Sequence, residues 1–116
     1  VSLHAPATPD TRHAVNSRTL ALMPDGSYVV NVARGDLVHT GDLLAAVDGG
    51  RIAGAFLDVT DPEPPRRDDP VLTHPSVVVT PHAAFYSVAT ARQYVMVPVD
   101  NVILALSGQR PGNAVN

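Results

Sequence analysis

The sequence predicts an α/β fold built on a parallel sheet with flanking helices. Three apolar runs, residues 28–33, 52–57 and 77–79, alternate with segments that carry helix signals. Strand–helix–strand alternation is typical of right-handed crossovers between parallel strands. The runs are apolar almost throughout, as expected of strands that helices cover on both faces. We therefore expect a fully buried parallel sheet.

The N-terminal part is predicted to hold the end of a strand and one short helix. Residues 1–3 are predicted to form the strand end, and a loop punctuated by prolines follows. Asn16 or Ser17 is suited to cap a helix over residues 19–23, because their side-chain oxygens accept backbone hydrogen bonds. Pro24 and Gly26 then end that helix, and the first clear strand follows over residues 28–33.

The middle of the chain is predicted to place a helix between the first two clear strands. Thr40 is expected to cap it, and Leu43, Leu44 and Val47 share one of its faces. A Gly-Gly pair at residues 49–50 ends it.

The last part is predicted to hold an exposed loop, the third strand and a long helix. Residues 61–70 contain four prolines and several charges, a composition typical of loops. Ser87 is expected to cap a helix that continues to about Ser107, and Gly108 ends it. Pro98 falls inside this helix, so we expect a kink or a break there.

The composition excludes several classes of function. The 116 residues make one domain at most, and 45% hydrophobic with 16% charged residues fits a globular protein. The net charge of −3 provides no basic surface for nucleic acid, and no apolar run approaches the roughly 20 residues of a membrane helix. There is no cysteine, and the histidines lack ligand-like spacing, so we expect no metal site. All eight basic residues are arginine, which suggests a GC-rich bacterial genome.

Residues suited to chemistry follow the three strands. His82 comes just after the third, Arg34 after the first, and Asp58 and then Glu63 after the second. In parallel sheets, sites form at the carboxyl ends of the strands, so we expect His82, Arg34 and Glu63 to converge on one crevice. A histidine can act as a general acid or base near neutral pH.

Each of these residues also has an ordinary structural interpretation. A lone histidine at a strand end is more often structural, and Glu63 alone would be a solvated loop charge. Glu63 is, however, the only glutamate among eleven acidic residues, and a carboxylate beside an imidazole stabilises its charged form and orients the ring. Arg34 is either a surface residue of a turn or a bidentate ligand for a carboxylate, and Gly35 allows a ligand or another backbone to approach.

At this point the sequence resembles the D-isomer-specific 2-hydroxyacid dehydrogenases, in the C-terminal part of their NAD-binding domain. The matching segments are VSLHAP (residues 1–6), VNVARGDLV (30–38), GAFLDVTDPEP (54–64) and TPH (80–82). They occur in family order and span nearly the whole chain. The resemblance implies the second half of a Rossmann-type domain over residues 1–86, followed by a helix and tail over residues 87–116 that cross toward a substrate domain.

The resemblance also implies a reaction, the transfer of a hydride between NAD(H) and a D-2-hydroxy acid or 2-keto acid, and the residues that perform it. Arg34 matches the arginine that orients the substrate carboxylate and carbonyl, His82 the acid/base, and Glu63 its carboxylate partner. Asp58 matches the residue that holds the nicotinamide carboxamide. The implied cofactor is NAD, with NADP not excluded, and the residues assigned to its binding are His4, Pro6, Ala33, Arg34, Asp58, His82 and Ala84.

The family resemblance further implies the setting of the protein. We expect a small 2-keto or 2-hydroxy acid as substrate, a cytoplasmic location and a homodimer, with neither nucleic acid nor membrane as a direct partner.

Two departures from the family pattern leave alternatives open. Residues 83–87 read AAFYS where many members have small residues, often glycines, and this resembles the branch of the C-terminal-binding co-repressors. There is also no G-x-G-x-x-G, the pyrophosphate-binding motif of the family. The alternatives are therefore a dinucleotide-sensing binding protein like the co-repressors, or a truncated chain without activity of its own.

Overall fold

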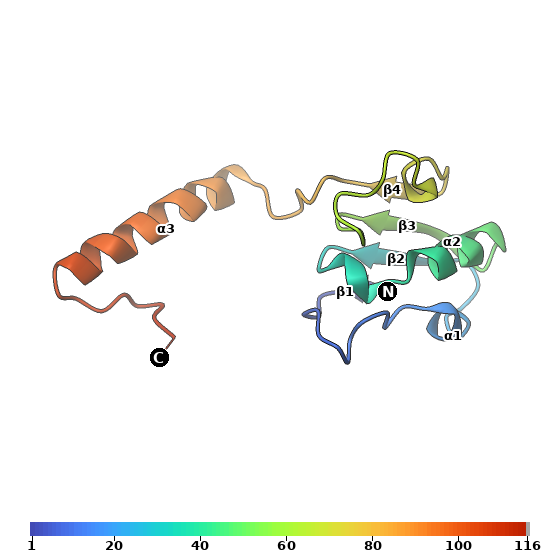
Figure 1. Ribbon diagram of the computed structural model, residues 1–116, viewed down its shortest axis with the longest axis horizontal. Coiled ribbons are helices and arrows are strands. Elements are labelled where there is room, and N and C mark those ends of the chain that lie inside the picture. The colour runs from blue at the N-terminus through green and yellow to red at the C-terminus, as the bar shows by residue number, and fades with distance from the viewer. Residues whose placement is uncertain (116) are drawn as a thin grey trace. The chain divides into compact units, whose positions relative to one another are not determined.

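The computed structural model describes residues 1–115 and divides the chain into two compact units, Val1–Ala84 and a second that begins at Phe85. The first unit holds a four-stranded sheet in the order β1-β2-β3-β4 (Figure 1). Every neighbouring pair of strands is parallel, which confirms the predicted fold class. The strands are β1 (Ser2–Leu3), β2 (Ser27–Asn31), β3 (Ile52–Leu57) and β4 (Val77–Val79).

The four strands end at the same level of the sheet. Leu3 is paired with Asn31, Asn31 with Leu57, and Leu57 with Val79. These are the last residues of β1, β2, β3 and β4. The loops that follow the strands therefore leave the sheet along one line.

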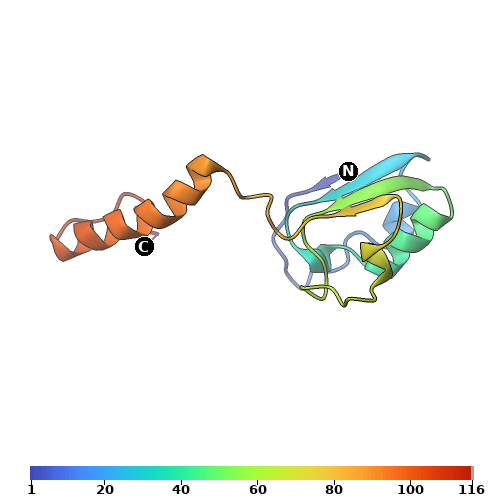
Figure 2. The same ribbon diagram turned by 90° about the horizontal axis from the view of Figure 1, so that it is seen from above.

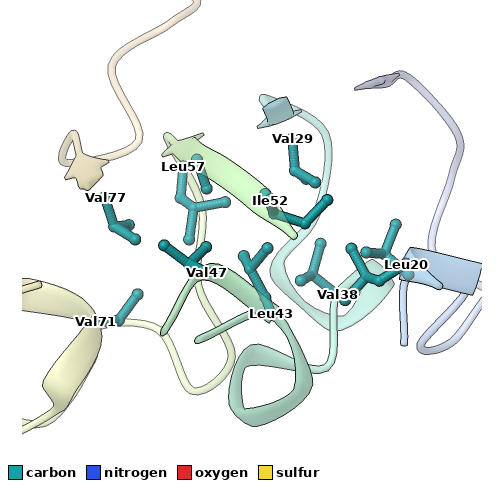
Figure 3. Close-up of a cluster of buried hydrophobic side chains, with 11 residues drawn as sticks. Leu20, Val29, Val38, Leu43, Val47, Ile52, Leu57, Val71 and Val77 are labelled. Atoms are coloured by element: carbon teal, nitrogen blue, oxygen red, sulfur yellow. The ribbon is translucent and has the colours of Figure 1, made fainter. Parts of the chain in front are cut away.

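The helices α1 (Ser17–Leu20) and α2 (Thr40–Asp48) pack on one face of the sheet (Figure 2). Leu20, Leu43 and Val47 from these helices join side chains of β2, β3 and β4 in the hydrophobic core (Figure 3). Val71, from a short 3₁₀ turn over Pro70–Leu72, belongs to the same core. All three connections between strands thus contribute side chains to the hydrophobic core on one face of the sheet.

The expectation that this sheet is buried on both faces is wrong for the described unit. Tyr28, Phe56 and Val78 are about half exposed, and the rings of Tyr28 and Phe56 lie 6.2 Å apart. The physical reason is chirality, because successive right-handed crossovers between strands in this order place their helices on the same side. The apolar residues of the opposite face are left without a covering layer within residues 1–84.

The helix ends match the predictions in part. Asn16 caps α1, as predicted, through hydrogen bonds from the N–H groups of Arg18 and Thr19, but α1 ends at Leu20 instead of residue 23. Thr40 is not the cap of α2. His39 is, because its backbone is extended and its Nδ1 accepts from the Asp42 N–H at 3.2 Å. Gly49 and Gly50 end α2 as predicted, with Gly50 at φ +74.

The second unit contains α3 (Val88–Leu106). Ser87 caps it through a 3.1 Å hydrogen bond from Thr90 N–H, and Gly108 follows its end at φ +72, both as predicted. Of the kink or break expected at Pro98, the break does not occur, since the helix continues through that residue. A proline removes a single backbone hydrogen bond, and the surrounding helix residues are exposed to water that can take its place. Neither α3 nor any other helix within residues 1–115 combines the length and hydropathy needed to cross a membrane.

Candidate active site

The loop after β2 begins earlier than predicted and carries Arg34. Asn31 is fully buried, and its side chain bonds the next turn: Nδ2 donates to the Arg34 carbonyl at 2.8 Å, and Oδ1 accepts from the Ala33 N–H at 3.1 Å. These side-chain bonds replace strand pairing, so β2 ends at Asn31 and not at Ala33. Arg34 itself is exposed and donates from Nη1 to the Ala33 carbonyl at 2.6 Å.

Gly35 lets this loop lie directly against the loop after β3. A Cβ atom on Gly35 would stand 2.0 Å from the Thr60 carbonyl oxygen and 2.8 Å from the Asp61 nitrogen. Both neighbours are backbone atoms, which cannot swing aside as a side chain would. Gly35 therefore sets the distance between the loop that carries Arg34 and the loop that carries Glu63.

His82 and Glu63 form a pair, with Nδ1 of the imidazole 2.7 Å from Oε1 of the carboxylate. Both side chains are a little under half exposed, at 47% and 41%. A carboxylate only accepts, so Nδ1 carries the hydrogen, and Nε2 is the nitrogen that gains and loses a proton. The pair therefore has the form of an oriented acid/base.

The backbone of His82 has a positive φ of 53°, a conformation that non-glycine residues rarely adopt. The neighbouring turn is attached to the last residue of β3 and to the residue after it: the Thr80 N–H donates to the Leu57 carbonyl at 2.9 Å, and the His82 N–H donates to the Asp58 carbonyl at 2.8 Å. The β4 exit is thus fastened to the β3 exit on either side of Pro81.

The carboxylate of Asp58 makes further bonds to the same turn. Oδ1 accepts from the Thr80 hydroxyl and from the Ala83 N–H, the latter at 2.9 Å, and Oδ2 accepts from the Ala84 N–H at 2.8 Å. Burial of Asp58, which is 5% exposed, raises its pKa. The hydrogen bonds from the hydroxyl and the two amides outweigh that effect, with a smaller contribution from His82, so the pKa of Asp58 lies below its ordinary value.

Three hollows surround these residues. The first, about 570 Å³, is lined by His4, Ala5, Pro6, Ala7, Val32, Ala33 and Arg34. The second, about 250 Å³, is lined by Val30, Val32, Phe56, Leu57, Asp58, Val78, Thr80, Ala83 and Ala84. The third, about 450 Å³, is lined by Asp58, Thr60, Glu63, Pro64, Pro65, Leu72, Val79, Thr80, Pro81 and His82.

The structure thus distributes the predicted site residues over adjoining hollows. Arg34 shares the first hollow with His4, whereas Glu63 and His82 share the third. Asp58 lines both the second and the third hollow, so it lies between the apolar strand ends and the acid/base pair. Within residues 1–115, no cluster of three or more histidine or carboxylate side chains is arranged to hold a metal ion.

Sequence reasoning missed the hydrogen-bonded turn around Asp58. Asp58 follows β3 directly and Thr80 follows β4 directly. Two polar residues in the same position after adjacent parallel strands are expected to meet, and this signal was available in the sequence.

Comparison with known proteins agrees with the geometry. The family model of the D-isomer specific 2-hydroxyacid dehydrogenase NAD binding domain matches residues 1–84. The D-lactate dehydrogenase of Treponema pallidum (strain Nichols) is 36% identical over 122 residues, covering 94% of this chain and 37% of that protein.

Solved structures show the same likeness. A protein of Thermus thermophilus matches with a TM-score of 0.93 and 40% identity, over 100% of this chain and 37% of that one. The NAD-complexed D-isomer specific 2-hydroxyacid dehydrogenase of Lactobacillus delbrueckii ssp. bulgaricus matches with a TM-score of 0.88 and 35% identity, over 99% and 39%. The chain therefore spans less than two fifths of the length of these relatives. With a family model matched over most of its length, the chain belongs to the D-isomer specific 2-hydroxyacid dehydrogenase family, within the NAD-binding domain.

Proposed function

We propose that the protein containing this chain is an NAD-dependent dehydrogenase that interconverts a 2-keto acid and a D-2-hydroxy acid. The observation that carries the proposal is the His82–Glu63 pair, with 2.7 Å between Nδ1 and Oε1, beyond the carboxyl end of β4. Residues 1–86 would form half of the dinucleotide-binding domain, and residues 87–116 would cross toward a substrate domain. The proposal includes a cytoplasmic homodimer.

The residues at the strand ends fit a dinucleotide. Asp58 Oδ2 accepts one bond from the protein and has a second lone pair available for an amide N–H, as the nicotinamide carboxamide would supply. His4 and Pro6 would contribute to the wall around the adenosine half. A bound nicotinamide would supply or accept the hydride, and the protein would supply position and charge.

The acid/base work falls to this chain's own side chains. In reduction, Nε2 of protonated His82 would donate a proton to the substrate carbonyl oxygen, and Glu63 would hold the ring by its other nitrogen. Arg34, which is exposed beside the first hollow, would bind the substrate carboxylate through two parallel N–H donors.

The activity is tested by giving the intact protein NADH and a panel of 2-keto acids with different side chains. The expected result is loss of NADH absorbance and a product of D configuration on chiral chromatography. Tight NADH binding without turnover of any keto acid would contradict the proposal and would favour the dinucleotide-sensing alternative.

Arg34→Lys is expected to lower kcat/KM for the keto acid by roughly 10- to 100-fold, because lysine keeps the charge but loses the planar pair of donors. The measurement is steady-state kinetics of reduction. Arg66→Lys, in an exposed loop, is the matched control and should leave kcat/KM unchanged. Equal kinetics for the two variants would show that the guanidinium geometry is not used.

Glu63→Gln is expected to lower kcat for reduction by about tenfold, because a neutral amide still accepts from Nδ1 but no longer stabilises the imidazolium charge. Asp68→Asn removes an exposed carboxylate from the same loop and serves as the control. If both variants turn over at the wild-type rate, Glu63 is a solvated loop charge and not a partner of His82.

A further inference from the structure

We propose that Asp58 is the positioning residue for His82, because its carboxylate and its backbone carbonyl fasten the turn on both sides of the histidine. The inference deepens the proposed function and rests on it. Asp58 would hold the turn that carries His82 through hydrogen bonds within the protein, in addition to any contact with the cofactor.

Asp58 receives hydrogen bonds from the chain on both sides of His82. The hydroxyl of Thr80 precedes His82, and the amides of Ala83 and Ala84 follow it, yet all three donate to one carboxylate. The His82 N–H donates to the carbonyl of the same aspartate at 2.8 Å. Asp58 therefore holds polar groups of the chain before His82, at His82 and after it.

The backbone conformation of His82 needs such a constraint. A residue with a side chain is unfavourable at a φ of 53°, and such a conformation persists only when its surroundings over-determine it. The bonds to Asp58 supply that constraint. Without them, the turn is expected to relax toward negative φ, which would carry the imidazole away from Glu63.

Asp58 is also buried, which makes its hydrogen bonds necessary to its charge. Asp58 is 5% exposed, and its pKa lies below the ordinary value, so the carboxylate is charged and accepts bonds at neutral pH. A buried charge that lost these donors would be strongly disfavoured. The charge of Asp58 and the conformation of the turn therefore stabilise each other.

The bonds can be tested directly in the intact protein by hydrogen exchange and ¹⁵N NMR. Asp58→Asn preserves the side-chain volume, but its NH₂ group replaces one carboxylate oxygen and cannot accept a hydrogen bond from a backbone N–H. We expect the exchange of the Ala83 and Ala84 amides to accelerate at least tenfold. Asp42→Asn is the matched control, because Asp42 Oδ2 accepts the Ser17 N–H at 2.7 Å in another part of the unit. Asp42→Asn should accelerate hydrogen exchange of the Ser17 amide and leave the exchange of the Ala83 and Ala84 amides unchanged.

The effect on His82 is tested by kinetics of the intact protein. We expect Asp58→Asn to lower kcat for reduction at least tenfold, with a smaller change in KM for NADH, since a displaced acid slows the proton transfer without removing the binding site. Thr80→Val removes only the hydroxyl and should lower kcat by a smaller factor, which Thr80→Ser should restore. This pair also keeps the test decisive if Asp58→Asn does not fold.

Three results would overturn the inference: unchanged amide exchange at residues 83 and 84 in Asp58→Asn, a raised KM for NADH with wild-type kcat, or equal kcat for Thr80→Val and Thr80→Ser. An intact wild-type protein that turns over no keto acid would instead overturn the proposed function. In that case the amide exchange data would still decide whether Asp58 holds the turn.

Discussion

His82→Asn is expected to lower kcat of the intact protein by roughly 10²-fold or more, the usual scale for loss of a general acid. Asparagine is the suitable replacement because, after glycine, it is among the residues that best tolerate the positive φ of 53° found at this position. The hydrogen bond from the N–H of residue 82 to the Asp58 carbonyl should therefore remain, and the loss of kcat should report the missing imidazole.

The chain provides a matched control for this substitution. His74 also pairs with a carboxylate, with Nε2 3.0 Å from Oδ1 of Asp48, but outside the three hollows. His74→Asn should leave kcat unchanged at saturating substrate. Turnover of His82→Asn at the wild-type rate would rule out His82 as the acid, whatever its contact with Glu63.

Gly35→Ala is expected to destabilise the chain by about 1–3 kcal/mol or more, and to reduce activity beyond that loss, because no room exists for a methyl group 2.0 Å from the Thr60 carbonyl. One of the two loops must move, and they carry Arg34 and Glu63. The measurements are the free energy of unfolding from denaturant titration and kcat/KM of the folded variant.

Gly41→Ala is the control for glycine replacement as such. Gly41 lies in α2, and a Cβ there would meet only the His39 ring at an ordinary 3.6 Å. This variant should gain roughly 0.5–1 kcal/mol, because alanine is the better helix former. A Gly35→Ala protein as stable and active as wild type would mean that the two loops separate without consequence.

The parts of the fold that depend on local signals could be predicted from the sequence. β3 has the expected bounds, Ile52–Leu57, and α3 begins after Ser87 and ends before Gly108 because caps and glycines act within a few residues. The end of β2 was predicted two residues too late, at Ala33 instead of Asn31, because the buried side chain of Asn31 takes over the backbone bonds of the turn. Such an override depends on tertiary packing, which no window of sequence displays.

In the candidate site, too, some features follow from local sequence signals and others depend on tertiary packing. The placement of His82, Arg34 and Asp58 just beyond strands follows from where apolar runs stop. The contact between His82 and Glu63 joins residues 19 apart, and its geometry depends on the path of the intervening loop. The hydrogen bonds from Ala83 and Ala84 to Asp58 were missed because they come from backbone amides, whose presence is the same for every residue type except proline.

The common level of the four strand ends has a consequence for how the site is specified. Counting from the last residue of each strand, His4, Asp58 and Thr80 all occupy offset one, whereas Arg34 and His82 occupy offset three. Each of these side chains thus stands a fixed number of residues beyond its strand, so the site is specified by chain length as well as by residue type. An insertion between Val79 and His82 would move the acid away from its place beyond β4 even if every residue were retained. Insertions within residues 65–69 would leave all five of these offsets intact and would act instead on the loop between Glu63 and His82, whose path sets the contact of that pair.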